Sequence, residues 1–426
     1  MRPYLAAKLD RYAKPAPMDR SRPAALSDTS TQGGNPLTFD PTRVRTIRLR
    51  SWDDIPDLES GWNGLLDRSP GHSVFQTFPW HVCWWRAFGD PHELLVILGY
   101  TGSRLVGIAP MMITRKRGPM GREQSQVRFI GSENHASDYC DFITDPDVPE
   151  ALDALLENLC VGSEAFYRVD LSHFPRHSPN QVRTLEYFKS RGMRASVQFL
   201  LDAPARILGD RQADLKAANK SSLKRHTGFF RKSGELCFHR CGSEEEILGY
   251  LEEFFEQHRS RWARTDSPSQ FFDPAQRGFY RELVREVFPC GWLRFDVVLF
   301  NGAPLAFHFG FEYRRRFIWY KPTFDVQFAS RSPGEVLIKF LLEDAIEKKL
   351  EEFDFTVGSE PFKYRFANRI RSVNRMIAFR SAGDYWIYRG VHRGKSMVKK
   401  LLGRNVASRD NPTSPMQRRF STAGGS

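Results

Sequence analysis

The sequence has no paired cysteine motif. Its six cysteines are scattered along 426 residues, and none of them forms a C-x-x-C pair. Cys237-x-His239-x-Cys241 comes nearest to a metal site, but its alternation suits the edge of a strand, and a second pair that would complete four ligands is missing. We therefore predict no metal, and thiols that stay reduced in a cytoplasm.

Long apolar runs are also missing. No stretch approaches the roughly 20 apolar residues that a membrane span needs, and the first residues do not form the apolar core of a signal peptide. We expect a chain that is not exported and that works in the cytoplasm.

The central part of the chain has little net charge. Residues 1–50 hold ten Lys and Arg against four Asp, and residues 389–426 hold nine against one. Of the total of +13, this leaves about −1 for residues 51–388. A fold that grips nucleic acid should carry its positive charge on the fold itself. The sequence therefore argues against nucleic acid as a partner.

Aromatic and apolar residues are abundant, with 34 Phe and 41% hydrophobic residues, enough for large cores. Residues 1–44 are rich in Pro, Arg, Ala and Ser, and we expect them to be disordered. A strand is predicted from Val44, a helix near residues 54–67, and an aromatic-rich helix from Pro79 to Phe88.

Two hairpins are predicted about 200 residues apart, one turning at Thr101-Gly102-Ser103 and the other at Asn301-Gly302. Each is followed by a further strand, a helix and another strand; in the first half one of these strands is expected at residues 138–144. We interpret this order as two tandem domains of one α+β fold, each a mainly antiparallel twisted sheet flanked by helices. The alternative is a coincidence between two ordinary α/β layouts.

The predicted domain boundaries follow from this repeat. We expect a basic, disordered segment at 1–44, a first domain at 45–203, a second at 204–388, and a basic, mostly disordered tail at 389–426. A single helix is expected at 214–236, with Lys216, Lys220 and Lys224 on one face. That face is either a cradle for phosphates or a solvated surface, and we favour the solvated surface.

The most informative stretch is residues 317–366. An aromatic strand leads there to Ser332-Pro333-Gly334-Glu335 at the start of a helix, where the first backbone N–H groups can face an anion. An acyl donor of the coenzyme A type has such an anion in its diphosphate. The structural alternative is a capping box, with Ser332 as the N-cap, Pro333 at N1 and Glu335 at N3.

The order of motifs in this half resembles a known family. LKAANKSSLKRH, RSRWA, PLAFHFGF, WYKPTFD, SPGEVL, EFDF and GSEPFKYRF follow one another as in the CelD/BcsL-type acetyltransferases, which serve bacterial cellulose and exopolysaccharide production and belong to the GNAT superfamily. That family is also similar to the FemABX peptidyltransferases, which are built from two GNAT-like domains. The resemblance covers about residues 60–385 and is most specific from Trp292 to Phe366.

The resemblance implies acetyl-CoA as the donor substrate, bound in the second domain. It places the donor diphosphate at Arg331, Ser332 and Gly334. Thr323 and Phe324, at the end of the preceding strand, are further candidates for donor binding. The first domain lacks such a turn, since its matching helix starts at residues 147–150, so no donor site is expected there.

Further positions match the family pattern, namely Asp325, Asp354, Gly358, Glu360 and Lys363. Phe362-Lys363 stands where relatives often show Tyr-Lys, so a role for that hydroxyl is not carried over. Tyr364 is expected to point away in an extended segment.

Acyl transfer needs a base for the acceptor's proton and donors for the developing oxyanion. The candidate bases are Asp325, Glu360 and His308, and Tyr320 or Lys363 can protonate a leaving thiolate. Each has a structural alternative: Asp325 as a turn cap, His308 as a core residue, and Glu360 with Lys363 as a simple ion pair. Backbone amides of residues 320–324 are the candidate oxyanion donors.

The sequence thus predicts an acyltransferase that moves an acetyl or related group from acyl-CoA to an amine or hydroxyl of a sugar-derived acceptor. The alternatives are a FemABX-like transferase that uses aminoacyl-tRNA, and a non-catalytic scaffold of a polysaccharide assembly. The basic tail, with an apolar stripe at Met397, Val398, Leu401 and Leu402, suggests a peripheral contact with the inner membrane. The alternative for the tail is a solvated segment with a short helix.

Overall fold

The computed structural model describes residues 43–55, 57–117, 123–134, 136–161, 166–263 and 268–401, with the backbone alone for 392–401. The strands are β1 (Arg45–Leu49), β2 (His92–Thr101), β3 (Arg104–Arg117), β4 (Glu123–Phe129), β5 (Ile143–Thr144), β6 (Arg168–Pro175), β7 (Arg194–Ile207), β8 (Leu236–Arg240), β9 (Leu293–Phe300), β10 (Ala303–Tyr313), β11 (Arg316–Phe324), β12 (Glu352–Asp354) and β13 (Arg369–Phe379).

Helices lie between these strands and at the end of the described chain. They are α2 (Leu58–Arg68), α3 (Phe78–Phe88), α4 (Glu150–Val161), α5 (Pro179–Ser190), α6 (Arg211–Ala218), α7 (Ser221–Ser233), α8 (Glu244–Trp262), α9 (Pro274–Val287), α10 (Pro333–Glu347), α11 (Pro361–Phe366) and α12 (Ala382–Leu401). Short 3₁₀ helices are η2 (Trp52–Asp54), η3 (Val74–Gln76), η4 (Gln270–Phe272) and η5 (Val326–Arg331).

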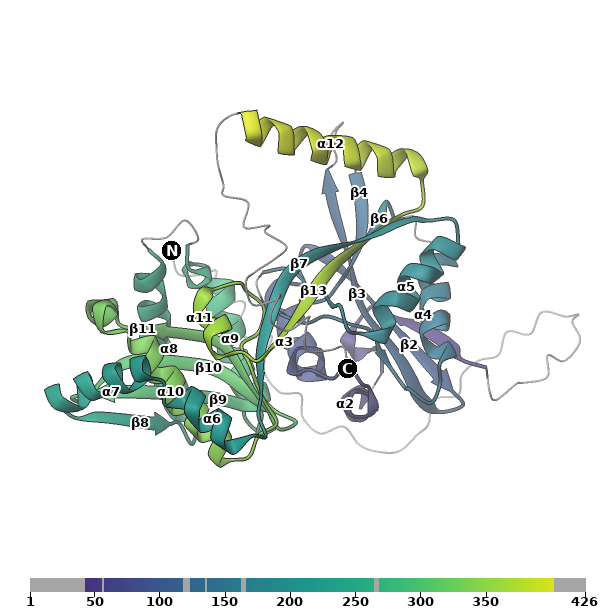
Figure 1. Ribbon diagram of the computed structural model, residues 1–426. Helices are drawn as coiled ribbons and strands as arrows, with labels where there is room; N and C mark the ends of the chain where they lie inside the picture. Colours follow the sequence, from purple (N-terminus) through teal and green to yellow (C-terminus); the bar gives the residue numbers. More distant parts are fainter. Residues whose placement is uncertain are drawn as a thin grey trace, which may run out of the picture. The chain divides into compact units, whose positions relative to one another are not determined.

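The strands form one sheet in the order β1-β2-β3-β4-β6-β13-β7-β12-β11-β10-β9-β8, with β5 paired to β3 (Figure 1). Two neighbouring pairs, β4 with β6 and β11 with β12, are parallel, and the other pairs are antiparallel. The α+β fold, with a mainly antiparallel twisted sheet and helices against it, is thus as predicted.

The predicted repeat is visible in the sheet. Each half of the chain contributes a hairpin, a following strand and a strand parallel to it: β2, β3, β4 and β6 in the first half, and β9, β10, β11 and β12 in the second. Both hairpins turn where the sequence indicated. Asn301 (φ 51°) and Gly302 (φ 79°) both take the left-handed conformation that a tight hairpin turn requires.

The two halves exchange strands. β13, from the C-terminal end of the fold, lies between β6 and β7, and β7 in turn pairs with β12 of the second half (Figure 1). β7 therefore runs across the predicted boundary at 203/204. β13 belongs to the second half in sequence, but it completes the sheet of the first half. The two-domain boundaries stay a prediction.

An aromatic core joins the halves. The buried Trp80 ring of α3 lies 5.6 Å from Phe311 of β10 and 5.5 Å from Phe279 of α9, and Phe75 lies 5.4 Å from Tyr320 of β11. Such edge-on and tilted aromatic pairs add to the free energy gained by burying their area. The loop that carries residues 136–141 is held against β11 by this core.

Three local predictions are wrong. Residues 138–142 are not a strand, and pairing begins only at Ile143. The single helix at 214–236 is two helices, because the chain turns at Asn219, whose Nδ2 donates to the Leu215 carbonyl (3.1 Å). Lys216, Lys220 and Lys224 therefore do not share a helix face. Tyr364 lies in helix α11, not in an extended segment.

The terminal segments lie largely outside the described residues. The expected disorder of residues 1–44 falls almost entirely outside the described residues, which begin at residue 43. Residues 402–426 of the tail, including Leu402, also lie outside them. Residues 389–401 continue α12 as helix. No described helix combines the length and the apolar character that crossing a membrane would require.

Candidate active site

The site begins where two parallel strands part. β11 and β12 pair only over Arg316–Ile318 and Glu352–Asp354, and just beyond, the Thr356 hydroxyl donates to the Trp319 carbonyl (3.1 Å). A cavity of about 940 Å³ lies at this fork. Where parallel strands separate, some backbone N–H and C=O groups lose their partner in the sheet, and a ligand can form hydrogen bonds with these groups.

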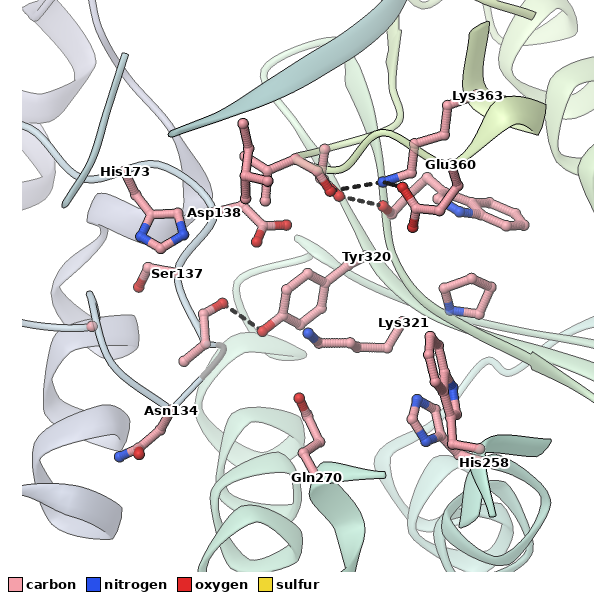
Figure 2. Close-up of a pocket in the computed structure, with 18 of the residues that line it drawn as sticks. Asn134, Ser137, Asp138, His173, His258, Gln270, Tyr320, Lys321, Glu360 and Lys363 are labelled. Carbon is pink, nitrogen blue, oxygen red and sulfur yellow. Dashed lines mark hydrogen bonds and ion pairs between the residues drawn. The ribbon is translucent and has the colours of Figure 1, made fainter. Parts of the chain in front are cut away.

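Both halves of the chain line the cavity (Figure 2). The first half supplies a loop after β4, and the second half supplies β11, the end of α8 and the segment before α11. The polar side chains of the lining are Ser132, Glu133, Asn134, Ser137, Asp138, His173, His258, Arg261, Gln270, Lys321, Thr356, Glu360 and Lys363, together with the hydroxyl-bearing Tyr320.

Asp138 is a lining carboxylate that was not predicted from the sequence. It is half-buried, and burial raises its pKa to about 6, although Lys321, Lys363 and a hydrogen bond with Thr356 favour its charged form. Figure 2 shows Asp138 entering from the first half of the chain, opposite Glu360 and Lys363. A carboxylate with a pKa near neutral is suited to accept a proton.

Glu360 and Lys363 form the ion pair expected from their spacing, at 3.1 Å. The buried Lys363 Nζ also donates to the Val357 carbonyl (2.7 Å). Gly358 has φ 135°, and a Cβ there would meet Glu360 and Lys363 at 2.2 and 2.7 Å. The turn at Gly358 is thus what lets both charged groups reach the cavity wall.

Tyr320 also lines the cavity, but its hydroxyl is occupied. It donates to the Ala136 carbonyl (2.5 Å) and accepts from Tyr280 (3.2 Å), whose own oxygen accepts from Gln270 (2.9 Å). Burial, the first of several causes, raises the pKa of Tyr320 well above its ordinary value. This arrangement holds the proton on Tyr320.

The neighbouring Lys321 was not singled out from the sequence. Its Nζ lies 4.4 Å from the Tyr320 ring centroid. Burial lowers its pKa, and the charge of Asp138 opposes that shift. Strand alternation would have placed it opposite Tyr320, but both side chains line the cavity (Figure 2).

Two predicted catalytic residues do not line the cavity. His308 is fully buried, 3.3 Å from Asp296 and stacked between Phe317 and Trp319, and burial lowers its pKa. Asp325 caps η5, accepting from the Gln327 N–H (2.9 Å). Their surroundings fit the structural alternatives: a core histidine and a turn cap.

Asp354 lies beneath the fork. It accepts from the Tyr139 hydroxyl (2.9 Å) and from the Thr356 N–H (2.8 Å), and it pairs with Arg371 at 3.1 Å. These bonds fix the strand end from which the cavity wall starts. The residue orients its neighbours and does not reach the cavity.

The predicted capping box at the start of α10 is not formed. Ser332 is the N-cap, with φ 54°, but its side chain caps nothing. Glu335 turns instead to Arg365 (2.6 Å), with His226 at 3.8 Å. The capping-box alternative is therefore wrong: the Glu335 N–H donates to the Ser332 carbonyl (2.9 Å) and not to the Ser332 side chain.

The five predicted donor residues lie around this turn. Arg331 stacks on the Phe229 ring (4.1 Å), and the Phe324 ring lies 3.4 Å from where a Gly334 Cβ would be. Thr323 is buried, and its hydroxyl has no hydrogen-bond partner among the residues that the structure describes. None of the five lines the cavity, but Thr323 and Phe324 directly follow Pro322, which does.

The described residues include one group with metal-ligand character: His239, Cys241 and Glu246, whose donor atoms lie within 4.8 Å of one another. Cys237 is not part of it. His239 Nε2 lies 2.5 Å from Glu246, and burial raises the pKa of the Cys241 thiol to about 12. The group offers three donor atoms, one fewer than the four ligands of a structural zinc site.

Comparison with known proteins gives the fold a family context. Residues 217–364 match the family model described as acetyltransferase (GNAT) domain. Similar solved structures include FemX (TM-score 0.55, 10% identity, 76% of this chain and 96% of that one) and a conserved protein of unknown function from Bacteroides thetaiotaomicron VPI-5482 (TM-score 0.50, 12% identity, 77% and 98%).

A tandem GNAT protein from the clavulanic acid biosynthesis pathway is also similar, with a TM-score of 0.43 and 12% identity over 78% of this chain and 98% of that one. A search of curated protein sequences found no match. The resemblance to the GNAT superfamily is thus confirmed for a domain in the second half, and at these identities the likeness to solved structures concerns the fold.

Proposed function

We propose that this protein is an acyltransferase that moves an acetyl or related acyl group from acyl-CoA to an amine or hydroxyl of a sugar-derived acceptor. The observation that carries the proposal is the cavity where β11 and β12 part. It lies at the edge of the segment that matches the acetyltransferase domain, and it gathers Asp138, Glu360 and Lys363.

The donor is assigned to the strand end and the start of α10. The Gly334 N–H at the start of α10 would face the diphosphate, with Arg331 supplying a charge. Pro333 has no N–H, and the Glu335 N–H already donates to the Ser332 carbonyl (2.9 Å). The Phe324 ring lies 3.4 Å from where a Gly334 Cβ would be, so the absence of a side chain at Gly334 is what lets a ligand approach the backbone there. The thioester would then reach the cavity along residues 320–324, whose amides are the candidate oxyanion donors.

For the chemical step we assign Asp138 as the base, with Glu360 as the alternative. The acceptor's nitrogen or oxygen attacks the thioester carbon, and its proton passes to the carboxylate. The carbon–sulfur bond breaks, and Lys363 protonates the leaving thiolate. Tyr320, His308 and Asp325 keep positioning roles, since the hydroxyl of Tyr320 is already bonded and the other two lie outside the cavity.

A FemABX-like transferase that uses aminoacyl-tRNA is the second candidate, and the fold likeness to FemX supports it. The salt dependence of donor binding distinguishes the two candidates: affinity for RNA should weaken steeply as the salt concentration rises, whereas affinity for acyl-CoA should change little. A non-catalytic scaffold would bind neither donor.

We place the reaction in the cytoplasm, in exopolysaccharide or cellulose biosynthesis, with peripheral contact to the inner membrane through the basic C-terminal segment. Trp386 and Ile387 of α12 are more than half exposed, which supports such a contact. Co-sedimentation with anionic liposomes tests the basic segment. A chain that ends at Tyr388 keeps Trp386 and Ile387 but loses the cations that follow, and it should bind less than the full chain. Equal binding would contradict the contact.

Thermal denaturation with acetyl-CoA, longer acyl-CoAs and free CoA tests the donor. A ligand at 100 times its dissociation constant adds about 2.7 kcal/mol to the stability. We expect this stabilisation to be lost in Gly334→Glu and kept in Gly278→Glu, a matched change at an exposed helical position of α9. Absence of stabilisation by any coenzyme would contradict the donor assignment.

A further inference from the structure

Arg261 at the end of α8 lines the cavity and is held rigidly there. Its Nη1 donates to the Pro322 carbonyl of β11 (2.9 Å). Its guanidinium carbon lies 4.4 Å from the Phe324 ring centroid and 5.6 Å from that of Trp262. Two aromatic faces and one carbonyl thus fix the plane of the guanidinium, with most of its five N–H donors not used by these contacts.

This cation has no carboxylate partner among the residues that the structure describes. Burial lowers its pKa to about 10, and the charge of Glu360 acts in the opposite direction without an ion pair between them. Other arginines that are largely shielded from solvent form ion pairs with a carboxylate: Arg206 with Asp214 (2.9 Å), Arg294 with Asp296 (2.8 Å) and Arg375 with Asp170 (2.6 Å).

Lys321 is a second cation near Arg261, whereas the pKa of the adjacent His258 is lowered to about 3, so its ring is uncharged. Both Arg261 and Lys321 lower the pKa of the buried His258, after burial itself, and His258 bonds to the Ser269 hydroxyl through Nδ1 (2.8 Å). A desolvated cation without a partner is costly to the folded state. Stacking on aromatic rings offsets part of this cost, and an anion in the cavity would offset the rest.

We propose that Arg261 binds an oxyanion group, a phosphate or a carboxylate, of the molecule that occupies the cavity. The inference rests on the proposed function in one respect: it makes the acceptor an acidic sugar derivative. Arg261 faces the same cavity as Asp138 and Lys363, whereas the donor diphosphate is assigned to the turn behind Phe324. A planar guanidinium fork binds phosphate and carboxylate through two parallel hydrogen bonds.

Calorimetric titration of the full chain tests the proposal. The probes are glucosamine 6-phosphate and glucuronate, each against neutral glucose, and CoA against pantetheine, which lacks the phosphates. We expect Arg261→Gln to weaken binding of a sugar phosphate or glucuronate at least tenfold and to leave CoA unchanged. A tenfold loss confined to CoA would keep Arg261 as an anion-binding residue but move the anion to the donor.

The control variant is Arg259→Gln, two positions earlier on α8, where the side chain pairs with the exposed Glu256 and does not line the cavity. If Arg261→Gln does not fold, Arg261→Lys carries the test, because it keeps the charge and loses the fork; several-fold weaker binding is expected.

Unchanged affinity of every anionic probe in the Arg261 variants, or no binding of any of them to the unaltered chain, would overturn the inference. These titrations need no acyl transfer. A chain that binds an anion through Arg261 but transfers no acyl group would therefore contradict the proposed function and leave this inference standing.

Discussion

The Tyr320 hydroxyl donates a hydrogen bond of 2.5 Å to the backbone carbonyl of Ala136, 184 positions earlier in the chain. This bond joins β11 to the loop that carries Asp138 into the cavity. A second bond, from the Tyr280 hydroxyl, completes the surroundings of the Tyr320 oxygen. The position of the candidate base therefore depends on a tyrosine of the other half.

Tyr320→Phe should lower the free energy of unfolding by about 1–2 kcal/mol, since it leaves the Ala136 carbonyl without its buried donor. Acetyl transfer should change only a few-fold, because the hydroxyl is a positioning group. Denaturant unfolding and initial rates measure both effects, with Tyr385→Phe on α12 as the control. A hundredfold loss of kcat with unchanged stability would instead make Tyr320 the acid that protonates the thiolate.

Asp138→Asn should lower kcat by about 10²–10⁴-fold, the usual contribution of a general base. The base works when deprotonated, so the rate of the unaltered enzyme should rise with pH through about 6, the raised pKa of Asp138. The variant should lose this rise and keep its affinity for acetyl-CoA. A variant with the same pH profile as the unaltered enzyme would move the role to Glu360.

Tyr320, Glu360 and Lys363 were predicted from one continuous stretch of 50 residues, and the structure places all three at one cavity. Asp138 and Arg261 were not, because their roles depend on contacts with β11 from segments far away in sequence. Asp138 sits in a stretch that alternates like a strand, and nothing local distinguishes its carboxylate from that of Asp141.

The capping box and the strand exchange were also mispredicted or missed because contacts between segments far apart in sequence decide them. Ser332 and Glu335 have the right spacing, but Glu335 reaches a stronger partner in Arg365, 30 positions later. Hairpins were predictable because turn residues are local. The partner of β13 was not, because an alternating pattern indicates a strand and leaves open which neighbour it pairs with.

Asp141 gives the fold a pH dependence. It is 2% exposed, its Oδ2 has no hydrogen-bond partner, and burial raises its pKa to about 7. The unfolded chain releases this proton near pH 4, so between about pH 4 and 7 the folded state holds more protons. Stability should therefore fall as pH rises through this window, by on the order of 3 kcal/mol from this group.

Asp141→Asn should remove most of that slope, because the amide keeps an acceptor for the Asn180 Nδ2 (3.0 Å) and carries no charge. Urea unfolding at pH 4.5 and pH 8 measures it, with Asp90→Asn on an exposed turn as the control. Equal slopes in the variant and the unaltered chain would show that Asp141 does not titrate in this window.

The exchanged strand predicts that neither half folds alone. A chain that ends at Asn368 lacks β13 and leaves the facing edges of β6 and β7 without partners. We expect it to be insoluble or to lose cooperative unfolding, whereas a chain that ends at Ser381 keeps β13 and should unfold cooperatively. If the shorter chain unfolds cooperatively and is as stable as the longer one, the fold does not need β13 and the prediction is wrong.

The central claim is that the donor lies at the fork between β11 and β12 with its diphosphate at the start of α10. A crystal structure of the protein with acetyl-CoA tests it most directly. We expect the diphosphate at the amides near Gly334 with Arg331 beside it, and the thioester within reach of Asp138. Coenzyme bound elsewhere, or a helix start covered only by its own side chains at saturating coenzyme, would contradict the account.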